Sequence, residues 1–376
     1  MSSLYIHIPF CLSKCPYCSF VSYPGMDGLH QRYAAALLRE AEELYRNTSI
    51  PPLSTLFLGG GTPTLLAGSE LAEIIICCQR LFGFADQAEI SIEANPKTVD
   101  PAKLTLLRES GINRLSIGVQ SFNDRELQFL GRPHSASDAA EAVRLAREAG
   151  FDNISLDLMY GLPGQDHTSW KQTLKQALSL SPNHLSLYEL TVEEGTPYHR
   201  QLEQGRLDLP DEDEIAAMDQ LTATLCRQAG LAQYEISNYA RAGHECCHNI
   251  NYWQNGSYLA LGAGAVGCLE GGRRQRKITD PLRYCEQIEA GQSVVQEEEC
   301  LEEMASFRET IIMGLRMNRG VSRKQLLRRY EIDLHDCYGA TLTRLIDQGL
   351  LKMSASHLRL TARGRIFANQ VMAELV

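Results

Sequence analysis

The segment HIPFCLSKCPYCSF, residues 7–20, decides how the rest of the chain is interpreted. Its three cysteines, Cys11, Cys15 and Cys18, are separated by three and then two residues, a spacing that allows three thiolates to bind one small iron-sulfur cluster. Such a cluster normally takes four cysteine ligands, so three leave one iron open to a small molecule. The alternatives are a zinc loop and three unrelated buried thiols. Zinc sites usually pair a C-x2-C unit with a second ligand pair, so the spacing favours the cluster.

Short aliphatic runs alternate with longer amphipathic ones over the first two hundred or so residues, which is the pattern of βα units around a parallel sheet. Helices are expected over 29–46 and 211–229. Six units are predicted, with strands over residues 4–8, 55–58, 89–93, 114–118, 154–158 and 184–188. A closed barrel of this type has eight strands. The sequence therefore predicts an α/β fold, a partial (β/α)6 barrel that is either open on one side or completed by other elements.

Three parts are predicted along the chain: a barrel over 1–230, a glycine-rich connecting region over 231–300, and a smaller α+β module over 301–376. The last part does not continue the alternation of strands and helices. In the last part we expect three helices, two short strands and a final helix, which suggests a winged-helix-like module. Such modules often bind DNA, but a few basic residues are weak support, so a packing or lid role is the default.

Composition limits the classes of function. The chain has 376 residues, of which 44% are hydrophobic and 22% charged, and its net charge is -10. No apolar run is long enough to span a bilayer, and the start of the chain lacks the features of a secretion signal. We therefore expect a cytoplasmic protein whose twelve cysteines are reduced thiols or metal ligands. The acidic balance argues against binding of nucleic acid through its phosphates.

Polar residues and glycines follow several of the predicted strands at the point where each ends. GGGTPT, residues 59–64, follows the second strand, Glu93 ends the third, Gln120 lies just past the fourth and Asp157 lies near the end of the fifth. Taken alone, the glycine run is as consistent with a plain tight turn as with a ligand cradle. Because the loops at the carboxyl ends of parallel strands meet at one face of a barrel, these groups and the cysteine loop predict one shared ligand site.

Seven motifs together resemble the oxygen-independent coproporphyrinogen III oxidase family of radical S-adenosylmethionine (SAM) proteins. The similarity covers essentially the whole chain, and the motifs are YIHIPFC (5–11), CPYCSF (15–20), FLGGGTPT (57–64), IEANP (92–96), IGVQSF (117–122), LGRPH (130–134) and DLMYGLPGQ (157–165). The resemblance implies a radical SAM barrel in which Cys11, Cys15 and Cys18 hold a 4Fe-4S cluster whose open iron binds SAM.

The resemblance also implies roles for the residues around the cluster. Tyr5 and Tyr17 are expected to border it, and Glu93 matches a position that grips the cofactor. The positions that contact the methionine part of SAM match Gly60, Gly61 and Thr62. The nearby substrate side, where true oxidases accommodate a second SAM, matches Gln120, Arg132 and Asp157.

Two departures favour the HemW-type haem chaperone branch of this family over the oxidases. Phe20 stands where true oxidases are expected to carry a fourth cysteine, and the amino-terminal extension expected of them does not precede Cys11. The expected function is haem binding and transfer to acceptor proteins, with coproporphyrinogen oxidation or another tetrapyrrole reaction of haem biosynthesis as the alternative. Whether SAM is cleaved is left open.

A second constellation, HNINYW at residues 248–253, resembles the H-N-x-x-Y-W motif of HemW-like proteins. There His248 is the favoured haem ligand, although a buried core histidine is the plainer alternative and His244, Cys246 and Cys247 are rivals. The expected cofactors are therefore a 4Fe-4S cluster, SAM and haem. The expected partners are haem-accepting proteins, with a homodimer left open, no nucleic acid, and at most peripheral membrane contact.

Overall fold

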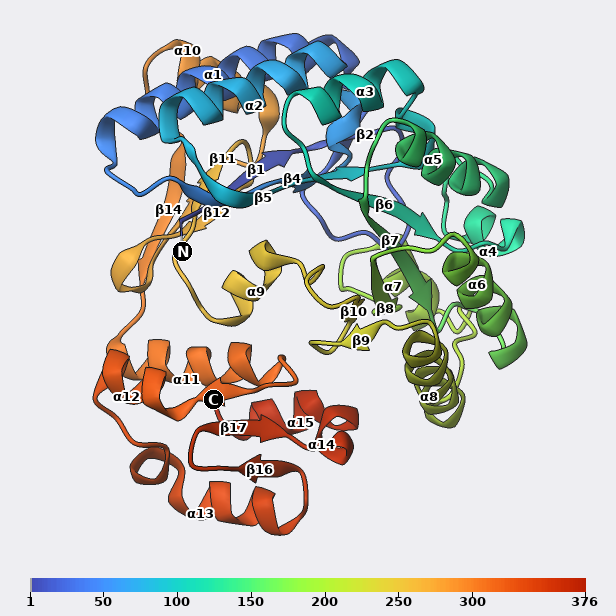
Figure 1. Cartoon of the computed structure of the whole chain (residues 1–376), viewed down its shortest axis with the longest axis vertical. Helices are drawn as coiled ribbons and strands as arrows, with labels where there is room; N and C mark the ends of the chain where they lie inside the picture. The colour runs from blue at the N-terminus through green and yellow to red at the C-terminus, as the bar shows by residue number, and fades with distance from the viewer. Residues whose placement is uncertain (1) are drawn as a thin grey trace.

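The computed structural model describes residues 2–376, and its main feature is a nine-stranded sheet with helices on its outer side (Figure 1). The six predicted strands are all present and pair in parallel in chain order. They are β1 (Ser3–Ile8), β4 (Leu53–Gly60), β5 (Phe84–Ala94), β6 (Arg114–Gln120), β7 (Asn153–Tyr160) and β8 (His184–Glu189).

Both edges of the sheet are extended by strands from the connecting region. β11 (Leu259–Leu261) pairs in parallel with β1, while β10 (Asn238–Ala240) pairs antiparallel with β8 and with β9 (Ala232–Gln233). The strand order runs from β11 to β9 without joining these two ends. The predicted partial barrel is therefore confirmed as open, even though other elements lengthen its sheet.

Helices cover the outer face because their apolar residues recur at helical spacing. In α1 (His30–Asn47), for example, Tyr33, Leu37 and Ala41 are buried at intervals of four residues. The other large outer helices are α2 (Gly68–Phe82), α3 (Pro101–Glu109), α5 (Ala136–Glu148), α6 (His167–Ser179) and α8 (Glu212–Gln228). No helix within residues 2–376 combines the length and apolar character needed to cross a bilayer.

One short helix, α9 (Cys247–Trp253), lies on the inner side of the sheet, between β4 and the first helix of the C-terminal domain (Figure 1). Its first backbone amides, those of Cys247 and His248, donate hydrogen bonds of 2.9 and 3.1 Å to the carboxylate of Glu89 on β5. A carboxylate suits this position because the first amides of a helix have no partner inside the helix. Glu89 therefore fixes the start of α9 against the sheet.

The remaining elements form two small sheets and the helices beside them. β12 (Val266–Cys268), β13 (Arg273–Lys277) and β14 (Val295–Cys300) form one sheet, near α10 (Pro281–Glu289). The C-terminal domain has its own buried core, which includes Phe307, Leu342 and Leu358. It comprises α11 (Glu303–Leu315), β15 (Val321–Ser322), α12 (Arg323–Tyr330), α13 (Leu334–Asp347), β16 (Leu351–Met353), β17 (His357–Leu360), α14 (Ala362–Ile366) and α15 (Ala368–Ala373). Three helices and the hairpin were predicted. The single final helix that was predicted is present as two short helices, α14 and α15, and β15 was not predicted.

Candidate functional site

A cavity of about 400 Å³ lies at the carboxyl ends of the parallel strands and brings most of the predicted site residues together. Its wall includes the cysteine loop, the glycine turn after β4 and polar groups from the next three strands. The predicted residues that line it are Cys11, Cys15, Cys18, Tyr17, Gly60, Gly61, Thr62, Glu93, Gln120, Arg132 and Asp157. Tyr5 and His248 are not among the lining residues.

The cysteine loop packs directly against the glycine turn. Gly61 donates its amide to the carbonyl of Ile8 at 2.9 Å, and Thr62 donates its amide to that of Phe10 at 2.7 Å. A Cβ atom at Gly61 would lie 2.4 Å from the Phe10 carbonyl oxygen and 3.0 Å from the Cys11 sulfur. Only glycine allows this approach, so the turn is shaped to hold the loop that carries the thiols.

The three predicted thiols all line this one cavity. Within residues 2–376, no group of three His, Cys, Asp or Glu side chains is placed to hold one ion. Cluster thiolates are bonded to separate irons, so they surround a larger object and need not converge on one point. Polar groups face two of the sulfurs: Thr62 Oγ1 lies 4.0 Å from Cys11 Sγ, and Arg132 donates to Cys15 Sγ at 3.6 Å. Burial raises the pKa of the Cys11 thiol, and hydrogen bonds from Ser22 and Thr62 partly offset that rise.

Two carboxyl groups lie in the cavity wall. Glu93 accepts the Gly60 amide at 3.1 Å, and Asp157 accepts the Ser116 hydroxyl at 3.1 and 3.2 Å to its two oxygens. Burial, together with the nearby Asp157 carboxylate, raises the pKa of Glu93 to about 8. Burial also raises the pKa of Asp157. Two such groups favour a ligand that brings positive charge, because it would relieve their desolvation and mutual repulsion.

The end of β6 is strained where it meets the cavity. Gln120 has a φ of 68° and follows an irregularity in the pairing of β6 with β7. Positive φ is uncommon for a residue with a side chain, and such conformations cluster at ligand sites. Arg132 donates to the carbonyl of Gly118 at 2.9 Å, and a Cβ at Gly118 would lie 3.2 Å from the Gln120 amide nitrogen. Gly118 therefore leaves room for both polar side chains.

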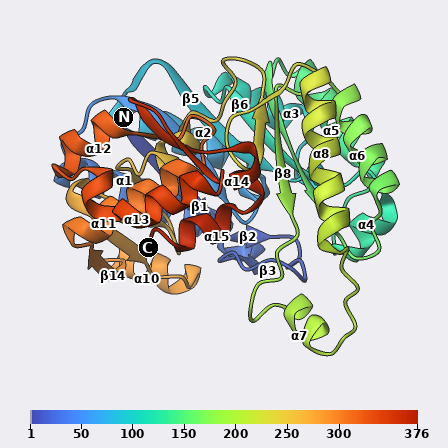
Figure 2. The same cartoon turned by 90° about the horizontal axis from the view of Figure 1, so that it is seen from below.

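Sequence reasoning missed the part of the wall at the end of β8 and just after it. Tyr188, Thr191 and Glu193 line the cavity there, and Tyr188 lies near the end of a predicted strand, so the strand-end argument could have found it. The helix that follows, α7 (Pro197–Glu203), projects from the same end of the molecule as β2 (Phe10–Cys11) and β3 (Tyr23–Pro24) (Figure 2). Its Tyr198 amide donates to the Pro16 carbonyl in the cysteine loop at 3.1 Å.

Tyr5 lies on β1 outside the cavity wall, with its hydroxyl 2.9 Å from His7 Nδ1 and its ring stacked on Phe57 at 6.3 Å between centroids. His248 does not line the cavity either. Its side chain is directed at the sheet, with Nδ1 2.8 Å from Thr55 Oγ1 and Nε2 2.9 Å from the Tyr252 hydroxyl. Only 1% of its surface is exposed, and burial lowers its pKa to about 3. In this conformation, both ring nitrogens are engaged within the protein.

Comparison with known proteins agrees with this geometry. The chain matches the radical SAM superfamily over residues 5–177 and the HemN C-terminal domain over residues 305–367. Its fold is similar to that of coproporphyrinogen III oxidase (HemN) from Escherichia coli, with a TM-score of 0.86 over 100% of this chain and 89% of the other, at 24% identity. That likeness shows a shared fold.

Sequence relatives define the branch more closely. The chain is 39% identical to the heme chaperone HemW of Bacillus subtilis, over 99% of this chain and 98% of that one. It is 43% identical to the heme chaperone HemW of Haemophilus influenzae, over 71% and 70% of the two chains. The shared fold, the three-cysteine pocket and this full-length identity together lead to one conclusion: the chain belongs to the radical SAM superfamily and, within it, to the HemW family.

Proposed function

We propose that this protein binds haem and delivers it to acceptor proteins, and that its cavity holds a 4Fe-4S cluster and SAM. The observation that carries the proposal is the full-length identity of 39% to a protein named heme chaperone HemW, combined with a cavity lined by all three cysteines and most of the other predicted residues. Phe20, rather than a fourth cysteine, stands at the cavity wall and is 67% exposed. This departure from the expected oxidase motif supports the chaperone over the oxidase.

The cavity residues have distinct tasks in this proposal. Cys11, Cys15 and Cys18 would hold the cluster, which supplies one-electron chemistry toward SAM when both are bound. The turn at 59–62 shapes the cavity wall, because the amides of Gly60, Gly61 and Thr62 are bonded to other parts of the protein. Glu93 offers a carboxylate that gains by facing a cation. Arg132 bridges the cysteine loop and β6 through Cys15 and Gly118, so it keeps the two walls in register.

Haem ligation by His248 stays a prediction, and the structure defines what it requires. Iron binds one ring nitrogen, so the ring has to give up either Thr55 or Tyr252, and α9 has to move away from β4 before a porphyrin can reach it. Exposing a side chain that is 1% exposed costs its packing and at least one of these hydrogen bonds. Ligation at this position therefore implies coupling between haem binding and a movement of α9.

We place this activity in the cytosol, because all twelve cysteines are free thiols, as expected in a reducing compartment. The partners proposed are haem-accepting proteins, and a homodimer is compatible with the same function. No role in binding nucleic acid is proposed for the C-terminal domain, given a net charge of -10.

The test uses anaerobically purified full-length protein with its cluster reconstituted. We expect a saturable haem spectrum and transfer of the bound haem to an apo-haemoprotein such as apomyoglobin. The same preparation is assayed for carbon dioxide release from coproporphyrinogen and for cleavage of SAM. Haem transfer without decarboxylation supports the chaperone. Sustained decarboxylation without haem transfer overturns it in favour of the oxidase.

A further inference from the structure

A second cavity, of about 690 Å³, lies between α9 and the C-terminal domain, away from the cysteine loop. One wall is Trp253, the last residue of α9, and the floor is formed by residues of α11, α12 and the turn that joins them. Its buried lining includes Gly314, Met317, Val321, Leu326 and Tyr330. We call it the seam cavity. Its volume and its apolar floor with aromatic edges are typical of a site for an organic ligand.

The rim of the seam cavity is cationic. Arg319, Arg328, Arg329 and His357 line it, and none of its lining residues within the described chain is Asp or Glu. This is unusual in a protein with a net charge of -10. Within residues 2–376, the side chains of Arg319, Arg328 and His357 make no hydrogen bond and no ion pair, so the two guanidinium charges of Arg319 and Arg328 have no partner in the protein. Guanidinium groups are suited to binding carboxylates.

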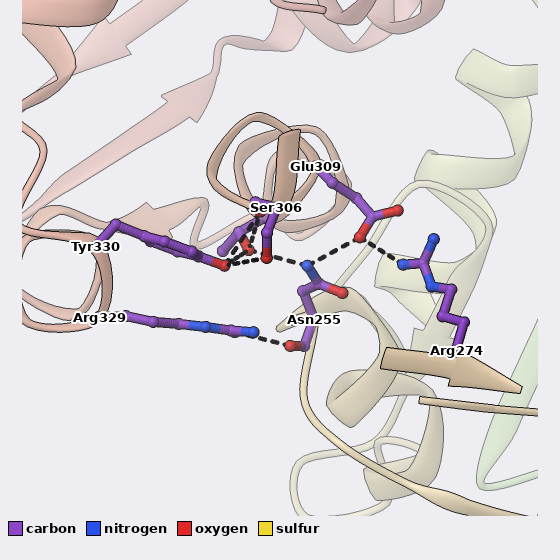
Figure 3. A network of polar contacts seen from close by, with 7 residues as sticks. Asn255, Arg274, Ser306, Glu309, Arg329 and Tyr330 are labelled. Carbon is purple, nitrogen blue, oxygen red and sulfur yellow. Dashed lines mark hydrogen bonds and ion pairs between the residues drawn. The ribbon is translucent and has the colours of Figure 1, made fainter. Parts of the chain in front are cut away.

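The walls of the seam cavity are held together by a polar network that crosses between the two parts of the molecule (Figure 3). Asn255, just after α9, donates from its side chain to Thr310 Oγ1 at 2.9 Å and to Glu309 at 3.1 Å. Arg274 of β13 pairs with the same Glu309, and Arg329 donates to the backbone carbonyl of Asn255 at 2.8 Å.

Two further contacts make the walls rigid. The guanidinium of Arg316 lies 4.4 Å from the centroid of the Trp253 ring, so it covers one face of the indole. At Gly320 a Cβ would lie 2.0 Å from the Leu358 carbonyl oxygen, so glycine is required where the turn approaches β17. The seam cavity is therefore built before any ligand arrives, which reduces the entropy lost on binding.

We propose that the seam cavity binds haem, with its apolar floor and Trp253 against the macrocycle and the guanidinium groups of Arg319 and Arg328 on the two propionates. Haem is flat, largely apolar and carries its two carboxylates at one edge, which matches an apolar floor with cations at the rim. This inference rests on the proposed haem-binding function and adds the site. The proposed site also gives the two ends of the HNINYW motif different tasks. His248 and Tyr252, four residues apart, face the sheet together, while Trp253 lines the seam cavity.

The test is a haem titration of the full-length protein, followed by the Soret band. In the double variant Arg319→Ala/Arg328→Ala we expect an affinity for haem at least tenfold lower than in the wild type. The matched control, Lys352→Ala/Arg363→Ala, removes two exposed cations of the same domain that do not line the seam cavity, and its affinity should stay within twofold. Haem dimethyl ester lacks the free carboxylates. It should therefore bind the wild type and both double variants with the same affinity, and that affinity should be lower than the affinity of the wild type for haem.

The outcomes separate the two proposals. If the wild type binds no haem, the proposed function fails. If the wild type binds haem and the Arg319/Arg328 double variant binds it equally well, the function stands and the seam cavity is the wrong site. If the double variant loses affinity for the free acid and the ester alike, the carboxylate contacts are refuted. Displacement of haem by an equal concentration of inorganic phosphate would also overturn the proposal, because it would reveal a site for small anions alone.

Discussion

The backbone amide of Gly60 on β4 donates a hydrogen bond of 3.1 Å to Oε2 of Glu93 on the neighbouring strand β5. The bond ties the glycine turn to the carboxyl group in the wall of the cavity that Cys11, Cys15 and Cys18 line, which we call the cluster cavity. Gly60 has a φ of 115°, and a Cβ there would lie 2.6 Å from the His7 ring. Both the backbone conformation and the lack of space for a side chain therefore require glycine at this position. One hydrogen bond therefore couples the shape of the turn to the ionisation of Glu93.

Binding of SAM is expected to depend on pH through Glu93. Its pKa is raised to about 8, chiefly by burial, so near neutral pH the free protein holds this carboxyl group mostly protonated. A cationic ligand favours the ionised form and lowers that pKa, so binding releases a proton. Affinity should therefore rise with pH, by roughly tenfold per unit at most, and level off above pH 8.

This dependence is measured by calorimetry of SAM binding to cluster-loaded protein between pH 6 and 9. Glu93→Gln removes the titrating group and should give weaker binding with a flatter pH profile. If the variant and the wild type show the same slope, Glu93 is not the group that titrates.

Each of the substitutions Cys11→Ala, Cys15→Ala and Cys18→Ala is expected to abolish the brown absorbance of the cluster and most of the bound iron and sulfide, since two thiolates cannot hold it. Cys300→Ala is the control, because Cys300 is exposed on β14 and outside the cavity. Full iron content in all three cavity variants would contradict the ligand assignment.

Gly61→Ala should damage the same site without removing a ligand. The added methyl group would lie 2.4 Å from the Phe10 carbonyl oxygen, so the cysteine loop has to shift and cluster content should fall several-fold. Gly28→Ala is the control, because nothing lies within 4 Å of a Cβ at Gly28. Iron analysis and circular dichroism of both variants separate a local effect from misfolding. Equal cluster content would show that the turn does not shape the loop.

His248→Ala is expected to lower the free energy of unfolding by about 2–4 kcal/mol, because it opens a cavity and leaves the hydroxyls of Thr55 and Tyr252 without their partner.

If His248 ligates haem, the variant also changes the haem spectrum while cluster absorbance stays intact. His244→Ala tests the nearby rival. If His248→Ala keeps the wild-type Soret band and His357→Ala changes it, the iron ligand lies at the seam cavity.

The burial of His248 is also expected to lower the free energy of unfolding at acid pH. The pKa of His248 in the folded protein is about 3, against an ordinary value of 6.5. Between these two pH values the unfolded chain binds a proton at this residue and the folded chain does not. Stability should decrease as pH falls from about 6.5 toward 3, with this residue contributing up to about 1.4 kcal/mol per pH unit. Denaturant unfolding of the wild type and His248→Gln at several pH values measures it, and the variant should show the shallower slope.

Much of the cluster cavity could be predicted because its parts are local in sequence. Each strand is a short aliphatic run, and Cys11, Gly60, Glu93 and Asp157 each lie at or near the end of such a run, so the order of βα units was enough to bring them to one end of the sheet. Tyr188 was missed although the same rule applied to it. The strands β9, β10 and β11 could not be predicted, because each has only two or three residues and its partner lies far along the chain.

The sequence by itself determined the six βα units, the cysteine spacing and the motif HNINYW, because each depends on neighbours within a few residues. Only the tertiary structure decided which way the motif faces and what surrounds it. The packing of α9 between β4 and α11 buried His248 against Thr55 and turned Trp253 toward the C-terminal domain. The fold of the C-terminal domain brings Arg319, Arg328 and His357 together at one rim, and the cavity beside them exists only after α9 has packed against that domain.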